Sequence, residues 1–154
     1  MKSLLSFAFA ALGLAGTPQL LSAADAPFLK DPPTDVVQFD HGKVDSVFAR
    51  GGALLLNNRY KVQSGRRVTS GPAEIHTYDT DIFYVLSGSA TFVTGGTAVQ
   101  ETTIGPGEAH AKSITGGTER HLTKGDVIII PKGVPHQFTQ VDGPFTYFVV
   151  KVKE

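Results

Sequence analysis

Short runs of hydrophobic residues follow one another along most of the chain, and their period changes near residue 52. Before this point, Val44, Val47 and Phe48 recur on one helical face, which predicts a short helix over Lys43–Arg50 that ends at Gly51-Gly52. Beyond it, the runs are rich in β-branched and aromatic residues and are too short for helices, so they predict strands. The predicted strands are Ala53–Leu56, Tyr60–Gln63, Ile82–Leu86, Ala90–Val93, Val127–Ile130 and Tyr147–Val152.

Glycine, proline and asparagine clusters separate these runs, a layout typical of an all-β sandwich or barrel. Ser87-Gly88-Ser89, for example, predicts a hairpin between the strands on either side of it. We expect the aromatic strand residues to form the core. They are Phe83, Tyr84, Phe92, Phe138, Phe145, Tyr147 and Phe148.

The first 24 residues have the layout of a secretory signal peptide. Lys2 precedes the apolar run Leu4–Leu14, and Ser22-Ala23-Ala24 or Ala24-Asp25-Ala26 supplies small residues for a cleavage site. The apolar run is shorter than the about 20 residues of a membrane span. We therefore expect residues 1–24 to be removed and the mature protein to be secreted or periplasmic.

The remainder is long enough for one domain with a continuous core. Residues 25–35 are proline-rich and predict an extended N-terminal arm over residues 25–40, and residues 41–154 form the single predicted domain. Without cysteine, the chain has no disulfide, no thiolate metal site and no lipoprotein anchor. Its 14 basic and 14 acidic residues give no net charge, which argues against nucleic acid and anionic membranes as partners. The pair Arg66-Arg67 predicts only a solvated strand end.

The most informative segment is residues 125–140, where a buried strand leads into a rigid turn and then a histidine. Pro131 and Pro135 fix φ and Gly133 permits positive φ, so the backbone that delivers His136 is strongly specified. A histidine on such a turn points toward whatever the strand lines. The alternative for this residue alone is a turn histidine that faces solvent.

Upstream, Glu74 and His76 are two residues apart and project from the same side of a strand, and Asp81 follows. Imidazole combined with carboxylate suits Fe, Mn, Ni or Zn, and two histidines with one carboxylate and open positions is the arrangement used by non-heme Fe(II) oxygenases. Alternatives remain for both carboxylates. Glu74 either binds metal, orients an imidazole, acts as a base or lies at the surface, and Asp81 either binds metal or caps the turn at Asp79-Thr80.

Two spacings carry a family resemblance. Gly125-x5-Pro131-x-Gly133-x2-His136 resembles the second motif of the cupin superfamily. The first motif of that superfamily resembles Glu74-Ile75-His76-x4-Asp81-x6-Gly88, with Glu74 where a histidine is usual and Asp81 where a glutamate is usual. The other register places Ile75 and Thr77 at the histidine positions, and neither is a good ligand.

The resemblance covers roughly residues 60–150 and implies an all-β, double-stranded β-barrel of jelly-roll type with a short N-terminal arm and helix. It places the two motifs on neighbouring strands around a cavity, with His76, Asp81, His136 and Glu74 as metal ligands. The segment Thr94–Leu122 departs from a minimal cupin, and we expect it either to cover the barrel as a lid or to extend a sheet used for dimer contact.

The resulting expectation is an exported, metal-dependent enzyme of oxygenase, isomerase or lyase type that acts on a small organic molecule, with Glu74 as the candidate catalytic base. The expected cofactor is a divalent transition metal, and the expected partners are the small molecule and a second copy of the chain. The alternatives are a non-catalytic protein that binds a sugar, a small acid or the metal, and a barrel that has lost its metal. The sequence has no Gly-x-Ser-x-Gly elbow and no phosphate-binding loop, so any catalysis depends on the metal.

Overall fold

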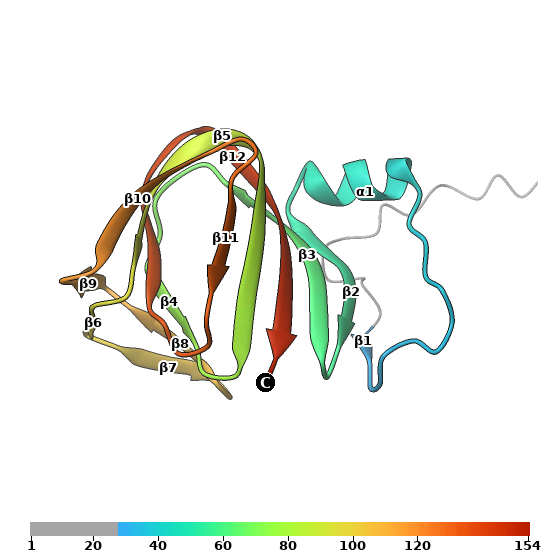
Figure 1. Cartoon of the computed structure of the whole chain (residues 1–154), viewed down its shortest axis with the longest axis horizontal. Helices are drawn as coiled ribbons and strands as arrows, with labels where there is room; N and C mark the ends of the chain where they lie inside the picture. Colours follow the sequence, from blue (N-terminus) through green and yellow to red (C-terminus); the bar gives the residue numbers. More distant parts are fainter. Residues whose placement is uncertain (1–27) are drawn as a thin grey trace, which may run out of the picture.

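The computed structural model describes residues 28–154, which form one helix and twelve strands (Figure 1). The expected signal peptide lies outside the described residues. The elements are β1 (Phe28–Leu29), α1 (His41–Phe48), β2 (Gly52–Asn57), β3 (Tyr60–Arg67), β4 (Ala73–His76), β5 (Asp79–Thr94), β6 (Thr97–Val99), β7 (Thr102–Gly105), β8 (Glu108–Ala111), β9 (Ser113–Thr115), β10 (Thr118–Thr123), β11 (Val127–Ile130) and β12 (His136–Lys153).

Two long strands, β5 and β12, pair antiparallel along their length and organise the barrel. The first half of β5 and the second half of β12 form the middle of one sheet, with β11 on one side and β3, β2 and β1 on the other. The other halves of β5 and β12 belong to a second sheet with β10, β4, β8 and β7. The two sheets curl around a common interior (Figure 1), which confirms the predicted double-stranded β-barrel.

The hairpin predicted at Ser87-Gly88-Ser89 is wrong, because β5 continues through these residues and bends there. Gly88 has a φ of 77°, and a Cβ atom at this position would lie 2.6 Å from the carbonyl oxygen of Pro144. The facing part of β12 also changes register, between Asp142 and Thr146. The glycine thus allows both long strands to pass from one sheet to the other while they remain in contact.

The inner faces of both sheets supply an aromatic core. Phe83 and Tyr147 have ring centroids 4.6 Å apart, and those of Phe92 and Phe138 are 4.4 Å apart. Each such buried ring contributes about 1.5–3 kcal/mol through the hydrophobic effect. Two residues predicted in this core lie instead on the outer face of the sheet, because alternate residues of a strand point to opposite sides. They are Tyr84 on β5 and its cross-strand partner Phe148 on β12, whose ring lies 6.2 Å from that of Phe48 on α1.

The predicted helix is confirmed as α1, which packs on β2 and β3. Its N-terminus is capped by Asp40, whose Oδ1 accepts a hydrogen bond from the backbone N–H of Lys43 at 2.9 Å. The part of the expected arm that the structure describes begins with β1, which pairs parallel with β2 through Phe28 and Leu56. This pairing anchors the start of the described chain to the edge of the barrel.

The segment Thr94–Leu122 builds the barrel wall and does not form a lid. Within it, β8 pairs with β4 and β10 pairs with β5. The small β6–β9 sheet contributes Ala98 and Ile114, which pack against Ala73 and Ile75 of β4 on the side away from the barrel interior. The segment therefore supports β4 through strand pairing along its edge and through packing against its outer face. This support matters because the site described below lies on β4.

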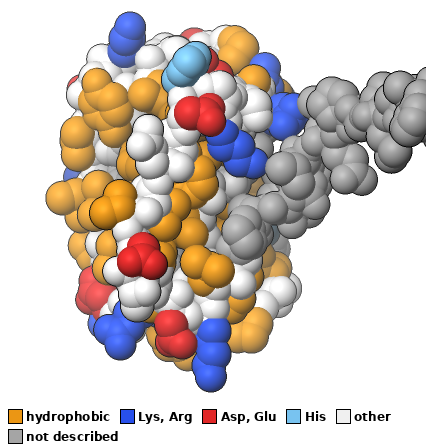
Figure 2. Space-filling view, turned by 90° about the vertical axis from the view of Figure 1, so that its right-hand side faces the viewer, with side chains coloured by type: hydrophobic (Ala, Val, Ile, Leu, Met, Phe, Trp, Pro, Cys, Tyr) orange, Lys and Arg blue, Asp and Glu red, His pale blue; other side chains and the backbone are white. Residues whose placement is uncertain are grey.

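The view in Figure 2 shows hydrophobic side chains interspersed with single acidic and basic ones, so charge of one sign does not dominate this side of the molecule. This mixture agrees with the zero net charge of the sequence. Over residues 28–154, no helix has the length and apolar character needed to cross a membrane.

Candidate metal centre

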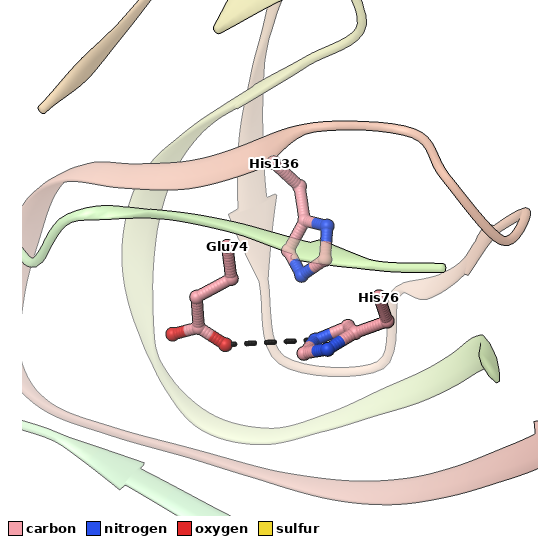
Figure 3. A group of neighbouring side chains, drawn as sticks. All are labelled: Glu74, His76 and His136. Carbon is pink, nitrogen blue, oxygen red and sulfur yellow. Dashed lines mark ion pairs between the residues drawn. The ribbon is translucent and has the colours of Figure 1, made fainter. Parts of the chain in front are cut away.

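Two neighbouring strands bring both motifs together. In β4, Glu74 and His76 project into the barrel, while the alternate residues Ala73 and Ile75 point outward. His136, the first residue of β12, is the cross-strand partner of Glu74. The three side chains converge (Figure 3), and their candidate ligand atoms all lie within 4.8 Å of one another.

The turn before β12 is tied directly to β4. Gly133 has a φ of 74°, and its N–H donates to the carbonyl oxygen of His76 at 2.7 Å. The N–H of Val134 donates to the carbonyl oxygen of Pro131 at 3.2 Å, which closes the turn. The motif therefore fixes His136 relative to His76, because one turn supports both residues.

Each imidazole is oriented by a hydrogen bond from its Nδ1 atom. His136 Nδ1 lies 3.0 Å from the carbonyl oxygen of Val134, which accepts only from a protonated nitrogen. His76 Nδ1 lies 2.5 Å from a carboxylate oxygen of Glu108 on β8. These contacts leave the lone pair on Nε2 in both rings, as is usual for histidines that bind metal.

Both Nε2 atoms are buried, and neither has a hydrogen-bond partner among the described residues. A buried polar atom without a partner costs free energy unless a ligand satisfies it. Burial also lowers the pKa of His136, which favours the neutral imidazole that metal binding requires. The two nitrogens therefore fit the role of metal ligands.

Two carboxylates face these nitrogens. Asp81 is 1% exposed, and its Oδ2 lies 3.5 Å from His76 Nε2 and 4.0 Å from His136 Nε2. Glu74 Oε2 lies 3.7 Å from His76 Nε2. Since metal–ligand bonds are about 2.1 Å, two ligands of one ion are at most about 4.2 Å apart. These three distances fit that limit, while the ligand atoms of Glu74, His76 and His136 as a group lie within 4.8 Å of one another. All four residues predicted from the sequence therefore gather at one place.

Basic residues that the sequence analysis did not assign to the site neutralise these carboxylates. Lys151 Nζ lies 2.5 Å from Asp81 Oδ2, and Arg67 forms an ion pair with Glu74. Burial alone would raise the pKa of Glu74, but the Arg67 guanidinium, together with His136 and His76, offsets burial and holds this pKa below its usual value. Arg67 is therefore not the solvated strand end that was predicted, since it also lies over the Phe138 ring at 4.7 Å.

Glu108 is the other residue that sequence reasoning missed. It is the cross-strand partner of His76 on β8, so its carboxylate projects to the same side as the imidazole. Its second oxygen lies 3.8 Å from Lys61, which is also 2.6 Å from Asp79. No local motif marks Glu108, because it is 32 residues from His76 in the sequence.

Comparison with known proteins agrees with this fold. Residues 110–154 match the family described as AraC-like ligand binding domain, and a search of curated proteins finds no match. Among solved structures, BH2720 from Bacillus halodurans has a TM-score of 0.55 at 15% identity, over 80% of this chain and 83% of that one. Hydroquinone 1,2-dioxygenase from Sphingomonas sp. TTNP3, solved with 4-hydroxybenzoate bound, has a TM-score of 0.55 at 13% identity, over 81% of this chain and 84% of that one.

The cupin domain of Cnp3 from Schizosaccharomyces pombe has a TM-score of 0.51 at 10% identity, over 68% of this chain and 64% of that one. At these identities the comparisons establish the fold. The protein is thus a double-stranded β-barrel with a buried cluster of imidazoles and carboxylates. It has the cupin fold, and the resemblance seen in its two motifs is confirmed at that level.

Proposed function

We propose that this cupin binds one divalent transition metal (Fe, Mn, Zn or Ni) and acts on a small organic molecule at that site. The observation that carries the proposal is the pair of buried, unpartnered Nε2 atoms of His76 and His136 beside two carboxylates. An ion held by imidazole and carboxylate supplies Lewis-acid catalysis or activates a bound water molecule.

The protein's own residues have separable roles in this proposal. His76 and His136 bind the ion through Nε2, and Glu108 and the Val134 carbonyl keep their rings in place. Asp81 supplies a buried carboxylate whose charge is shared with Lys151. Glu74 is the most exposed of the four, at 24% of its side chain, and is therefore the one most accessible to a small molecule.

Metal content measured by elemental analysis tests the site. We expect about one metal ion per wild-type chain, and a sharp loss of that metal in His136→Ala after identical handling. His121→Ala is the matched control, because His121 is an exposed imidazole on β10 outside the cluster. Equal metal content in the wild type and in His136→Ala would place the metal elsewhere.

Glu74→Gln distinguishes a ligand from a catalytic base. The ion pair with Arg67 and the lowered pKa support a role as ligand or anchor, because a carboxylate that holds its charge so firmly is a weak base. A ligand role predicts weaker metal binding in the variant. If Glu74 is instead a catalytic base, the reaction rate of the variant should fall about 10²–10⁴-fold while the metal stays bound.

The alternative function is binding without catalysis, which the match to an AraC-like ligand binding domain favours. Incubation of the metal-loaded protein with small sugars, phenols and keto acids, followed by mass spectrometry, separates the two functions. A product that disappears in His136→Ala supports the enzyme. Recovery of every compound unchanged, with O2 and a reductant supplied, supports the binding protein.

We also propose that the protein is exported, on the basis of the charge, apolar length and cleavage site of residues 1–24. N-terminal sequencing of the protein recovered outside the cytoplasm should give a start near Asp25 or Pro27. An intact Met1 on a cytoplasmic product would contradict this proposal.

A further inference from the structure

A pocket of about 180 Å³ opens at one end of the barrel, where the β2–β3, β4–β5 and β7–β8 turns meet the end of β12. We call it the end pocket and define it by Asn57, Tyr60, Lys61, Tyr78, Glu108 and Lys153. None of the four candidate metal ligands lines it. Glu108 lies between the end pocket and the candidate metal centre, because it lines the pocket and also contacts His76 Nδ1. This nitrogen is on the opposite side of the His76 ring from Nε2, the candidate metal-binding atom.

Asn57, one of the residues that line this pocket, carries a buried donor without a partner. The residue is 3% exposed, and its Oδ1 accepts hydrogen bonds from the backbone N–H groups of Arg59 and Tyr60, both at 2.9 Å. These two bonds fix the orientation of the amide, since only the oxygen can accept. Nδ2 is then buried with no acceptor anywhere in residues 28–154. Either a buried water molecule or a bound ligand would supply the missing acceptor.

Lys153 brings positive charge to the same pocket. Its Nζ lies 5.8 Å from the centroid of the Tyr78 ring, and it forms no ion pair within the described part of the chain. The other cation of the pocket, Lys61, is by contrast paired with Asp79 at 2.6 Å. A cation without an ion-pair partner, in the same pocket as a buried donor, is suited to a carboxylate.

Aromatic rings form part of the remaining lining, which also includes Asn58, Pro106 and Asp79, the carboxylate that is paired with Lys61. The Tyr78 ring packs against Gly107, where a Cβ atom would lie 2.3 Å from the ring, so this wall is held in place by direct contact with the backbone. Tyr60 and Phe28 also line the pocket. Flat aromatic walls around a few polar groups favour a flat, unsaturated ligand.

We propose that the end pocket is a second ligand site, separate from the metal centre, that binds a small aromatic or conjugated carboxylate. The carboxylate accepts a hydrogen bond from Asn57 Nδ2 and faces Lys153, while the ring packs against Tyr60 and Tyr78. This site does not require the proposed metal, because the groups that recognise the ligand are outside the metal centre.

Benzoate is the probe, added to the full chain labelled with 15N, in the presence of a chelator. We expect the side-chain amide resonances of Asn57 to shift on binding, because its N–H gains a charged acceptor. The neutral isostere benzamide should bind on the order of tenfold more weakly, since hydrogen bonds to charged groups are the stronger ones. Benzoate that leaves the Asn57 amide unmoved would overturn the proposal.

Four variants assign the effect to the two groups. Asn57→Asp keeps the turn-capping oxygen but removes the donor, and Asn58→Asp adds the same charge to the same pocket without removing a buried donor. We expect benzoate affinity to fall on the order of tenfold to a hundredfold in Asn57→Asp and clearly less in Asn58→Asp. Lys153→Met should also weaken binding, whereas Lys124→Met, an exposed lysine outside the pocket, should not.

His136→Ala separates this proposal from the proposed metal function. Benzoate binding that persists in this variant supports a separate site, whether or not the metal is lost. Benzoate binding that disappears with the imidazole, or that falls equally in both asparagine variants, would contradict a separate site built on Asn57.

Discussion

Glu108→Gln should weaken metal binding although Glu108 itself is not a candidate ligand. The carboxylate accepts the Nδ1–H of His76 at 2.5 Å, which fixes the tautomer of the ring and raises the electron density on Nε2. Loss of such a partner typically reduces metal affinity by about 10–100-fold, equivalent to about 1.4–2.7 kcal/mol. The Glu108 side chain is 34% exposed, so solvent screens part of its charge. We therefore expect about a tenfold loss for Gln, which keeps an acceptor oxygen, and a larger loss for Glu108→Ala.

The assay is a competition titration of Zn²⁺ or Co²⁺ against a chromophoric chelator at pH 7.5. Glu101→Gln is the control, because it removes a carboxylate from an exposed position outside the site. With Co²⁺, the visible absorption bands should also shift in Glu108→Gln, because a ring that is held less firmly changes the ligand field. A purely structural role would alter the unfolding midpoint of the metal-free protein and leave the spectrum unchanged. Unaltered affinity and spectrum in Glu108→Gln would refute the reasoning.

Two further predictions concern stability. In the metal-free protein, burial depresses the pKa of His136, so the neutral imidazole stabilises the fold above the unfolded pKa of about 6.5, and this stability is lost as the pH falls toward the folded pKa. Urea midpoints measured between pH 7.5 and 5.5 should therefore fall in the wild type and fall less in His136→Ala. Parallel curves for the two proteins would count against this cause. Gly65→Ala places a Cβ atom 2.0 Å from the Tyr147 ring and should lower the free energy of unfolding in urea by about 1–3 kcal/mol. Gly105→Ala is the control and should lower it clearly less, because the new Cβ atom would lie 3.9 Å from its nearest neighbour. Similar losses of stability in the two variants would mean that the Tyr147 ring moves aside.

The sequence alone determined the features that depend on local geometry. The parity of a strand places Glu74 and His76 on one side, and the proline and glycine residues before His136 fix the turn that delivers it. The period of the hydrophobic runs likewise indicated the short helix and the strands at Val127–Ile130 and Tyr147–Val152. Each of these conclusions requires only residues that are close together in the chain.

Tertiary structure decided what depends on the register between distant strands. Ser87-Gly88-Ser89 has the composition of a hairpin turn, but the backbone of Pro144 packs against Gly88, so the residues bend one continuous strand. Glu108 reaches His76 and Lys151 reaches Asp81 from 32 and 70 residues away in the sequence. Which side chain lies opposite another across a sheet is set by the pairing of whole strands, and a shift of one residue would send each of these charges to the other side. Local pattern therefore predicted the groups that face the candidate metal. The residues that orient and neutralise these groups are determined only by the pairing of distant strands in the folded barrel.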